Sequence, residues 1–244
     1  MNARPPAALV VALDFPTASP ALRIAGKVRG IVSWVKVGME LFSAEGPRVV
    51  HELKDLGFAV FLDLKLHDIP NTVHGAVRAA AGLRADMLTL HLVGGERMIR
   101  AAVEAARSGP HSPLLFGVTV LTSMEPGEFF GSRAQSAGAL SNIAKKLAVR
   151  AGAWGMDGVV CSGHDVRKIR RATGLSCLTP GIRPVCVAQH DQRRIAGPAG
   201  AVRAGSDYLV VGRPITAAPD PVRAAEEILR DMRGAYRKPS PHTM

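Results

Sequence analysis

Cysteine is scarce in this sequence, with three residues in 244: Cys161, Cys177 and Cys186. Their irregular spacing, without a Cys-x-x-Cys pair, argues against a disulfide framework. Cys161 and Cys177 lie in strand-like runs and are expected to be core thiols. The composition suits a reducing cytosol, so we expect a cytoplasmic protein.

Long apolar runs and acidic residues are also few. No run approaches the roughly 20 apolar residues of a membrane-spanning helix. The N-terminal apolar run ends at Asp14 with no small-residue cleavage site behind it, so neither a membrane span nor a signal peptide is expected. Lys and Arg total 31 against 20 Asp and Glu, a net charge of +11. This excess leaves open nucleic acid or an anionic small substrate as the partner.

Apolar residues make up 47% of the chain and gather in short runs separated by helix-like stretches. This alternation predicts a parallel sheet, either a closed barrel or an open doubly wound sheet. The eight strand-like runs are Leu9–Phe15, Trp34–Gly38, Ala59–Lys65, Met87–Leu92, Leu114–Thr122, Gly158–Ser162, Ser176–Ile182 and Tyr208–Arg213. The helix-like stretches include Gly46–Leu56, Val73–Leu83, Glu96–Arg107, Ala139–Ala153 and Asp220–Arg233.

Polar residues cluster at the C-terminal ends of nearly all these runs, where barrel enzymes build their sites. An open nucleotide-binding sheet is expected to have a glycine-rich fingerprint after its first strand, and Asp14–Thr17 has none. The sequence therefore predicts an α/β fold: a single (β/α)8 TIM barrel over residues 1–236, with its active site at the C-terminal ends of the strands, and a short basic tail at residues 237–244. Two long connections on that side, Ser123–Gly138 and Arg183–Gln192, are candidates for a closing loop and a lid.

The stretch Asp63–Pro70 combines charge with apolar sequence at the end of a buried strand. Alternation places Asp63 and Lys65 on one face of the strand, and Asp68 follows at the corner between strand and helix. An isolated Asp-x-Lys is most often a surface ion pair, but charges embedded in apolar sequence are costly and usually retained for function. Lys36, within another strand-like run, also needs a carboxylate partner such as Asp63. Together these four residues would form an array of alternating charge that keeps both amines protonated.

Further polar groups end other strands. Alternation turns Asp14 toward the barrel mouth, where a turn residue and a ligand group are equally expected. Gly212-Arg213 ends the eighth run and Arg183 follows the seventh, a combination that suits a phosphate. The histidines show no ligand spacing, so His67 and His91 are expected to form hydrogen bonds near the rim, and no metal is expected.

The segment Phe61–Thr72, FLDLKLHDIPNT, closely resembles the signature of the orotidine 5′-phosphate decarboxylase family. The resemblance covers Leu9 to Pro221. Asp-x-Lys-x-x-Asp alone is shared with sugar-phosphate decarboxylases and synthases, so the extension Ile69–Thr72 and the later motifs single out the family. The other matching motifs are Val11–Asp14, Val35–Gly38, Val118–Met124, Leu178–Pro184, Asp191–Ile195 and Val211–Pro214.

The resemblance implies a carboxy-lyase that converts orotidine 5′-phosphate to UMP in de novo pyrimidine biosynthesis, without cofactor or metal. It implies that Lys65 protonates C6 of the pyrimidine and that Asp63 stands beside the departing carboxylate. Lys36 and Asp14 would hold ribose hydroxyls while completing the charge array.

Asp68 is the fourth implied catalytic residue. The resemblance places it, with Thr72, in the active site of a neighbouring subunit, so we expect a homodimer with shared sites. The remaining substrate-binding residues that the resemblance implies are Ile69, Thr122, Arg183, Gln192, Gly212 and Arg213.

Two other functions compete with this one. A sugar-phosphate decarboxylase or synthase of the same superfamily would share the Asp-x-Lys-x-x-Asp core and require Mg²⁺. A basic nucleic-acid-binding protein would explain the net charge, but the cations are scattered along the sequence and no stretch interleaves them with aromatic residues. We therefore expect neither a nucleic-acid nor a membrane partner.

Overall fold

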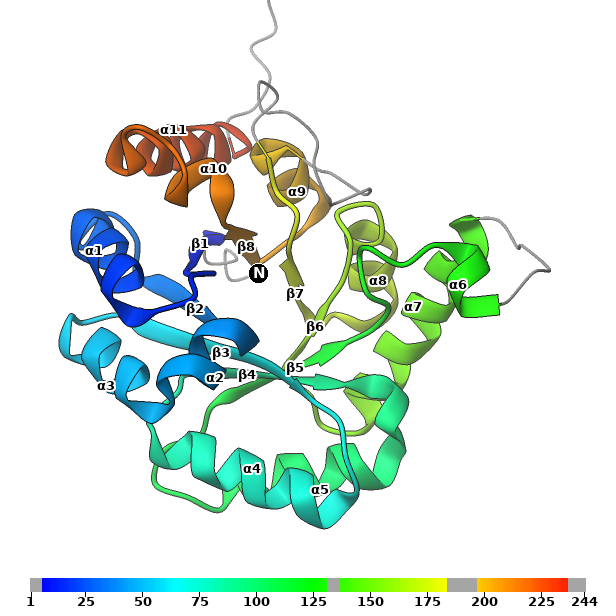
Figure 1. The fold of residues 1–244 in the computed structure, drawn as a ribbon. Coiled ribbons are helices and arrows are strands. Elements are labelled where there is room, and N and C mark those ends of the chain that lie inside the picture. Colours follow the sequence, from blue (N-terminus) through cyan, green and yellow to red (C-terminus); the bar gives the residue numbers. More distant parts are fainter. Residues whose placement is uncertain (1–5, 131–136, 184–196, 237–244) are drawn as a thin grey trace, which may run out of the picture.

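The computed structural model describes residues 6–130, 137–183 and 197–236. Eight parallel strands pair in chain order, and β8 pairs with β1 to close the barrel (Figure 1). The predicted α/β architecture, a (β/α)8 barrel, is therefore confirmed. The strands are β1 Ala8–Ala12, β2 Trp34–Gly38, β3 Ala59–Leu66, β4 Met87–His91, β5 Leu114–Val118, β6 Gly158–Val160, β7 Ser176–Thr179 and β8 Tyr208–Val211.

Helices surround the strands on the outside of the barrel (Figure 1). Pro70 takes the first position of α4, where proline is expected because the first N–H of a helix has no intrahelical partner. The helix-like stretch Val73–Leu83 therefore continues a helix that begins at Pro70. The helices are α1 Ala18–Val28, α2 Met39–Glu45, α3 Pro47–Asp55, α4 Pro70–Gly82, η1 Leu92–Gly94, α5 Gly95–Arg107, α6 Pro126–Phe130, α7 Ala137–Ala153, α8 Val166–Thr173, α9 Pro198–Ala204, α10 Arg213–Thr216 and α11 Pro221–Gly234.

Several strands are shorter than their apolar runs. β5 ends at Val118, whereas the apolar run continues to Thr122. The run is longer than the strand because apolar side chains beyond the ladder, such as the buried Val120, also pack at the barrel mouth. The segment Ser123–Gly138 contains the short helix α6, so it is not wholly irregular. Gln192 and the rest of the predicted lid beyond Arg183 lie outside the described residues, as does the predicted tail.

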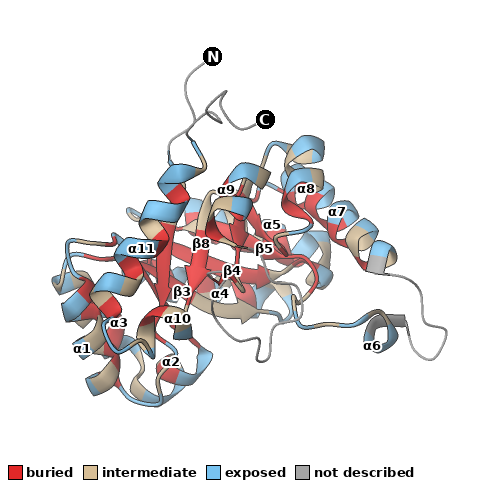
Figure 2. Ribbon diagram, turned by 90° about the horizontal axis from the view of Figure 1, so that it is seen from above, coloured by how far each residue is buried: buried red, intermediate tan, exposed pale blue. Residues whose placement is uncertain are grey.

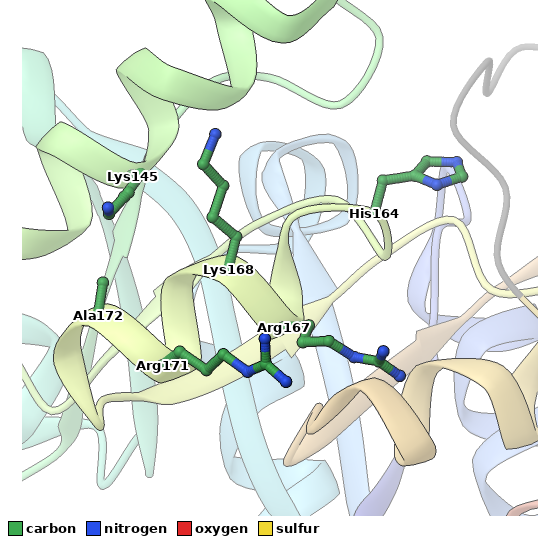
Figure 3. Close-up of a pocket in the computed structure, with 6 residues that line it drawn as sticks. All are labelled: Lys145, His164, Arg167, Lys168, Arg171 and Ala172. Atoms are coloured by element: carbon green, nitrogen blue, oxygen red, sulfur yellow. The ribbon is translucent and has the colours of Figure 1, made fainter.

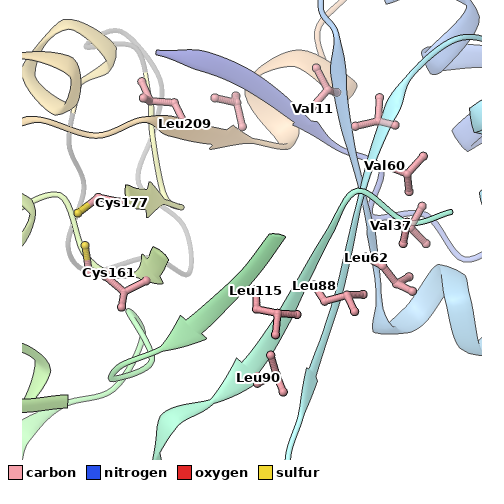
Figure 4. Packing of buried hydrophobic residues seen from close by; sticks show 14 of the residues in the cluster. Val11, Val37, Val60, Leu62, Leu88, Leu90, Leu115, Cys161, Cys177 and Leu209 are labelled. Atoms are coloured by element: carbon pink, nitrogen blue, oxygen red, sulfur yellow. The ribbon is translucent and has the colours of Figure 1, made fainter. Parts of the chain in front are cut away.

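The strands alternate between two apolar layers, as their sequences predict. Val10 and Ala12 belong to an inner cluster that fills the barrel, whereas Leu9 and Val11 belong to an outer cluster beneath the helices. Figure 2 shows this burial concentrated in the strands and on the helix faces toward them, and Figure 4 shows part of the outer cluster. At the N-terminal end of the barrel the Tyr208 ring packs edge-on against two other aromatic rings, those of Trp34 and Phe116, with centroids 5.5 and 5.6 Å apart.

Three aspartates tie the strands together at the N-terminal rim of the barrel. Asp86, just before β4, donates its N–H to the carbonyl of Val60 on β3 and accepts the Val60 N–H on its carboxylate. The same carboxylate binds the Lys54 ammonium at 2.6 Å. We call these arrangements rim joints: Asp86 with Val60 and Lys54, Asp157 with Leu115 and Arg107, and Asp207 with Cys177 and Arg170.

Candidate functional site

A cavity of about 600 Å³ opens at the C-terminal ends of the strands, on the side where the sequence predicts the site. Its floor includes the inward-facing Ala12, Phe61 and Val210 of the inner cluster. The predicted site residues that line it are Asp14, Lys36, Asp63, Lys65, Thr122, Arg183, Gly212 and Arg213. The rest of its wall includes residues of the matching motifs that were not named as site residues, together with Thr216: Leu121, Ser123, Pro180, Gly181, Ile182 and Pro214.

Four of these side chains form an alternating line of charge. Lys36 Nζ lies 2.7 Å from Asp14 Oδ1 and 3.6 Å from Asp63 Oδ2. Asp63 Oδ2 in turn lies 2.8 Å from Lys65 Nζ. Since two carboxylates face two ammonium groups, the array is neutral overall while each member is held by opposite charge. Lys36, Asp63 and Lys65 of the expected array thus lie together. Asp14 extends the line at its Lys36 end, whereas Asp68, expected beside Lys65, is exposed and does not line this cavity.

The end of β2 leaves room for this array because it is a glycine. Gly38 lies opposite Asp63 in the ladder. A Cβ at Gly38 would stand 2.9 Å from Lys36 Nζ and 3.0 Å from Asp14 Oδ1. A side chain here would therefore push apart the Lys36–Asp14 pair, so the Lys-x-Gly sequence is part of the site.

Strand β3 is not regular where it carries the charges. Its register against β4 shifts between Leu62 and Leu66, and Lys65 has a left-handed backbone with φ of 51°. Residues other than glycine rarely adopt that conformation, and it persists where the surroundings hold it. The Lys65 N–H is held by Thr89 Oγ1 on β4, at 3.0 Å, and the Thr89 hydroxyl donates to Asp63 Oδ1 at 2.8 Å.

Burial and charge act in opposite directions on Asp63. Burial raises its pKa, but the neighbouring Lys36 and Lys65 ammonium groups and the hydrogen bonds from Lys65 and Thr89 outweigh burial, so the pKa is lowered. The carboxylate therefore stays ionised beside both amines. The pKa of His91 is also lowered, first by burial and then by the charges of His67 and Lys65.

His67 and His91 lie together at the rim, with ring centroids 5.6 Å apart. Within the residues that the structure describes, no group of three or more His, Cys, Asp and Glu side chains is placed to hold a metal ion. None of the described helices has the length and apolar character needed to cross a membrane. Cys161 and Cys177 are buried in the outer cluster, as expected from their strand-like runs.

Two arginines line the cavity from the ends of β7 and β8. Arg183 follows β7 and is 7% exposed, and Arg213 opens the short helix α10 after β8. Gly212, between β8 and that helix, lies close to Asp14, since a Cβ at this position would be 3.8 Å from Asp14 Oδ2. Cationic groups and polar backbone from the ends of β7 and β8 thus border the same cavity, with Gly212 beside the Asp14 end of the array.

Three predicted site residues do not line the cavity of the single chain. Asp68, Ile69 and Thr72 are exposed after β3, and Ile69 keeps 66% of its surface accessible. The Asp68 carboxylate accepts the N–H of Ile69 at 2.6 Å. These three residues are therefore exposed at the surface rather than directed into the cavity of their own chain. A fourth predicted residue, Gln192, lies outside the described residues.

A second hollow, of about 480 Å³, lies on the outer surface between α7 and α8 (Figure 3). Its side chains are mostly cationic, and Figure 3 shows them spread apart rather than directed at one point. They come from α7, α8 and the turn before α8, which contribute none of the residues around the barrel-mouth cavity. The residues that line it are Lys145, His164, Arg167, Lys168, Arg171 and Ala172.

Thr89 is the functional candidate that sequence reasoning missed. The signal was present, because Thr89 is a polar residue inside the apolar run Met87–Leu92 and is 1% exposed. Its position opposite the irregular part of β3 depends on the register shift, which alternation along a single strand does not reveal.

Known proteins resemble this chain over almost its whole length. The family model described as "Orotidine 5'-phosphate decarboxylase / HUMPS family" matches residues 7–228. The orotidine 5′-phosphate decarboxylase of Nitratidesulfovibrio vulgaris (strain DP4) is 56% identical over 238 residues, covering 95% of this chain and 100% of that protein. The protein of the same name from Lawsonia intracellularis (strain PHE/MN1-00) is 50% identical over 228 residues, covering 91% and 98%.

A solved structure is similar as well. The crystal structure of orotidine 5′-phosphate decarboxylase from Lactobacillus acidophilus superposes with a TM-score of 0.80 at 36% sequence identity. The match covers 93% of this chain and 99% of that one. The similarity therefore includes the whole barrel and the strand ends that form the cavity.

Proposed function

This chain belongs to the orotidine 5′-phosphate decarboxylase / HUMPS family, and on that premise we propose that it converts orotidine 5′-phosphate to UMP in pyrimidine biosynthesis. The competing activity expected from the sequence is that of a sugar-phosphate decarboxylase or synthase with the same Asp-x-Lys-x-x-Asp core. The relatives that match at 50–56% identity over nearly their full length carry the decarboxylase name, which favours this activity over the sugar-phosphate alternative.

The observation that carries the mechanism is the Lys65 ammonium, held 2.8 Å from Asp63 at the wall of the cavity. In the reaction the bond between C6 and the carboxylate breaks, CO2 leaves, and the electron pair remains on C6. A fixed ammonium beside C6 stabilises that pair as it develops. Lys65 then gives C6 a proton and is left as the neutral amine, which takes a proton from water to restart the cycle.

Asp63 and Lys36 keep the proton donor in place. The Asp63 carboxylate is ionised, because its pKa is lowered by both lysines, and its Oδ2 binds and orients the Lys65 Nζ. Lys36 and Asp14 extend the array toward the region where a ribose would lie, and their ammonium and carboxylate groups match ribose hydroxyls.

Arg213, Gly212 and Arg183 are proposed to bind the phosphate. A guanidinium binds phosphate oxygens with paired hydrogen bonds, and both arginines border the cavity away from Lys65. Thr122, also on the wall, would contact the pyrimidine, and Gln192 is proposed to join the phosphate contacts. Binding energy at the phosphate, remote from C6, would serve to position the ring for decarboxylation.

We also propose a homodimer in which Asp68, Ile69 and Thr72 complete the partner's site. Support comes from the exposed apolar side chains at the ends of three adjacent strands: Met39, Ile69 and Val93 are 54, 66 and 53% exposed after β2, β3 and β4. A second copy that covers this edge would bury them and bring Asp68 to another cavity. A cytoplasmic location is proposed as well, because the few cysteines are irregularly spaced and include no Cys-x-x-Cys pair.

A spectrophotometric assay of orotidine 5′-phosphate turnover tests the proposal, with EDTA present and Lys65→Ala as the control. We expect conversion to UMP by the wild type and its loss in the variant. Absence of conversion by folded wild-type protein, followed by turnover of a sugar phosphate when Mg²⁺ is restored, would establish the competing activity instead.

A further inference from the structure

Thr89 occupies the inward row of β4 directly above the barrel floor. Met87, two residues earlier on the same face, belongs to the inner apolar cluster, whereas Leu88 and Leu90 belong to the outer cluster. Thr89 thus lies one layer nearer the mouth than Met87 and is 1% exposed. A hydroxyl so deeply buried must have partners, because an unsatisfied one is costly.

Both partners of that hydroxyl belong to the charge array. It accepts the Lys65 N–H at 3.0 Å and donates its proton to Asp63 Oδ1 at 2.8 Å. The other oxygen of Asp63, Oδ2, binds the Lys65 ammonium at 2.8 Å. Thr89 therefore joins the backbone of the proposed proton donor to the carboxylate that orients its side chain.

The regular β3–β4 ladder does not fix the backbone of β3 at Lys65. Leu62 of β3 pairs with Leu88 of β4, but the next pair is Leu66 with Leu90. The extra residues of β3 bulge out, so the ladder is interrupted beside Thr89. Lys65 adopts its left-handed conformation within this interruption. The Thr89 oxygen takes the place of a ladder carbonyl for the Lys65 N–H.

We propose that Thr89 is a positioning residue for the decarboxylation, whose hydroxyl fixes the direction in which the Lys65 ammonium leaves β3. This inference rests on the proposed function of Lys65. Thr89 is not among the residues that line the cavity, so it acts through Lys65 and Asp63 rather than on the substrate. A small displacement of a catalytic group lowers the rate strongly, because the reacting atoms must be close to their reactive geometry.

Thr89→Val tests the hydroxyl, since valine keeps the branched shape, and Thr89→Ser is the matched control that keeps the hydroxyl. We expect kcat to fall about 10- to 100-fold in Thr89→Val and to stay within about threefold of wild type in Thr89→Ser. The affinity for UMP should change little in either, since the residues proposed to bind the phosphate follow β7 and β8, whereas Thr89 lies on β4. The acid limb of the kcat/KM profile should move to higher pH in Thr89→Val, because Asp63 loses a hydrogen bond that lowers its pKa.

Amide hydrogen exchange at Lys65 gives a readout that does not depend on turnover. Exchange should be faster in Thr89→Val than in wild type or Thr89→Ser. If Thr89→Val does not fold, Thr89→Ala, which introduces no new methyl group, provides the second hydroxyl-free variant. Wild-type kcat in the hydroxyl-free variant, or equal losses in the valine and serine variants, would overturn the positioning role. Inactive wild-type protein with the expected exchange pattern would instead refute the proposed reaction.

Discussion

The two rims of the barrel use the same ion-pair chemistry in different ways. At the N-terminal rim the carboxylate of each joint accepts hydrogen bonds from a backbone N–H and from a cationic side chain. Asp207, for example, accepts them from the Cys177 N–H and the Arg170 guanidinium. At the C-terminal rim the partners of the Asp63 carboxylate within the described residues are side chains, those of Lys65 and Thr89, with Lys36 at 3.6 Å. The carboxylates of the rim joints are hydrogen-bonded by the backbone of the folded barrel. The Asp63 carboxylate depends on groups that border a cavity and are therefore available to a substrate.

This difference separates stability from activity. A charge satisfied by backbone groups on two strands holds those strands together, and its removal is expected to weaken folding. A charge held by other side chains beside a cavity favours reaction, and its removal is expected to weaken turnover. Variants at the two rims therefore test whether the division holds.

The largest effect is expected from Lys65→Ala. Loss of both the ammonium and the proton donor should lower kcat about 10⁴-fold or more, while UMP still binds. Lys54→Ala is the matched control at the other rim, where the ammonium belongs to the Asp86 joint. It should lower the free energy of unfolding and leave kcat unchanged. Steady-state kinetics and urea unfolding of both variants measure the two quantities, and substantial turnover by Lys65→Ala would remove it from the proton-donor role.

Arg213→Ala is expected to lower kcat/KM about 100-fold, through loss of paired hydrogen bonds to the substrate phosphate. Thermal unfolding should be unchanged, because Arg213 is exposed at the cavity edge. Arg203→Ala, at an exposed arginine of α9, controls for the loss of one positive charge. A stability loss without a change in kcat/KM would assign Arg213 to the fold instead.

Asp207→Asn should lower the free energy of unfolding by about 2 kcal/mol, because the Arg170 guanidinium loses its ionic partner and the strand N–H its charged acceptor. Values of kcat and KM should match the wild type. Urea unfolding followed by circular dichroism measures the change. Impaired turnover in a variant of unchanged stability would contradict the division between the rims.

The contribution of Asp63 to the free energy of unfolding is expected to depend on pH. Its pKa is lowered in the folded protein, since both lysines outweigh burial. The resulting stabilisation is complete above the ordinary carboxyl pKa of about 3.9 and is lost as the pH falls through the lower folded value. The stability difference between wild type and Asp63→Asn should therefore be constant from about pH 7 to 5 and shrink below about pH 4. Unfolding curves across this range test it, and an unchanged difference at about pH 3 would argue against a lowered pKa.

The smallest effect is expected from Glu96→Gln, which removes an exposed ion pair with Arg100 on α5. Such a pair belongs to neither rim, and its loss should change the free energy of unfolding by no more than about 0.5 kcal/mol. The same urea titration measures it. A larger effect would show that exposed pairs contribute as much as the rim joints.

Much of the fold and the site followed from local sequence. The alternation of Val10, Ala12 and Asp14 already placed the inward face of β1, and the charges of Asp63 and Lys65 stood out within apolar sequence. Thr89 did not, because its role depends on a register shift between two strands that neither strand specifies alone. The position of Asp68 depends on a second chain, which is why its place in a partner's site stays a prediction.

The rim joints also bear on how this chain tolerates change over evolution. Each joint connects one helix to the next two strands: α3 to β3 and β4, α5 to β5 and β6, α8 to β7 and β8. The three blocks follow one another in the sequence without overlap. An insertion after β4 or β6 leaves all three joints intact. Segments can therefore be exchanged between related barrels at these two places, because the hydrogen bonds and ion pair of each joint stay within one block.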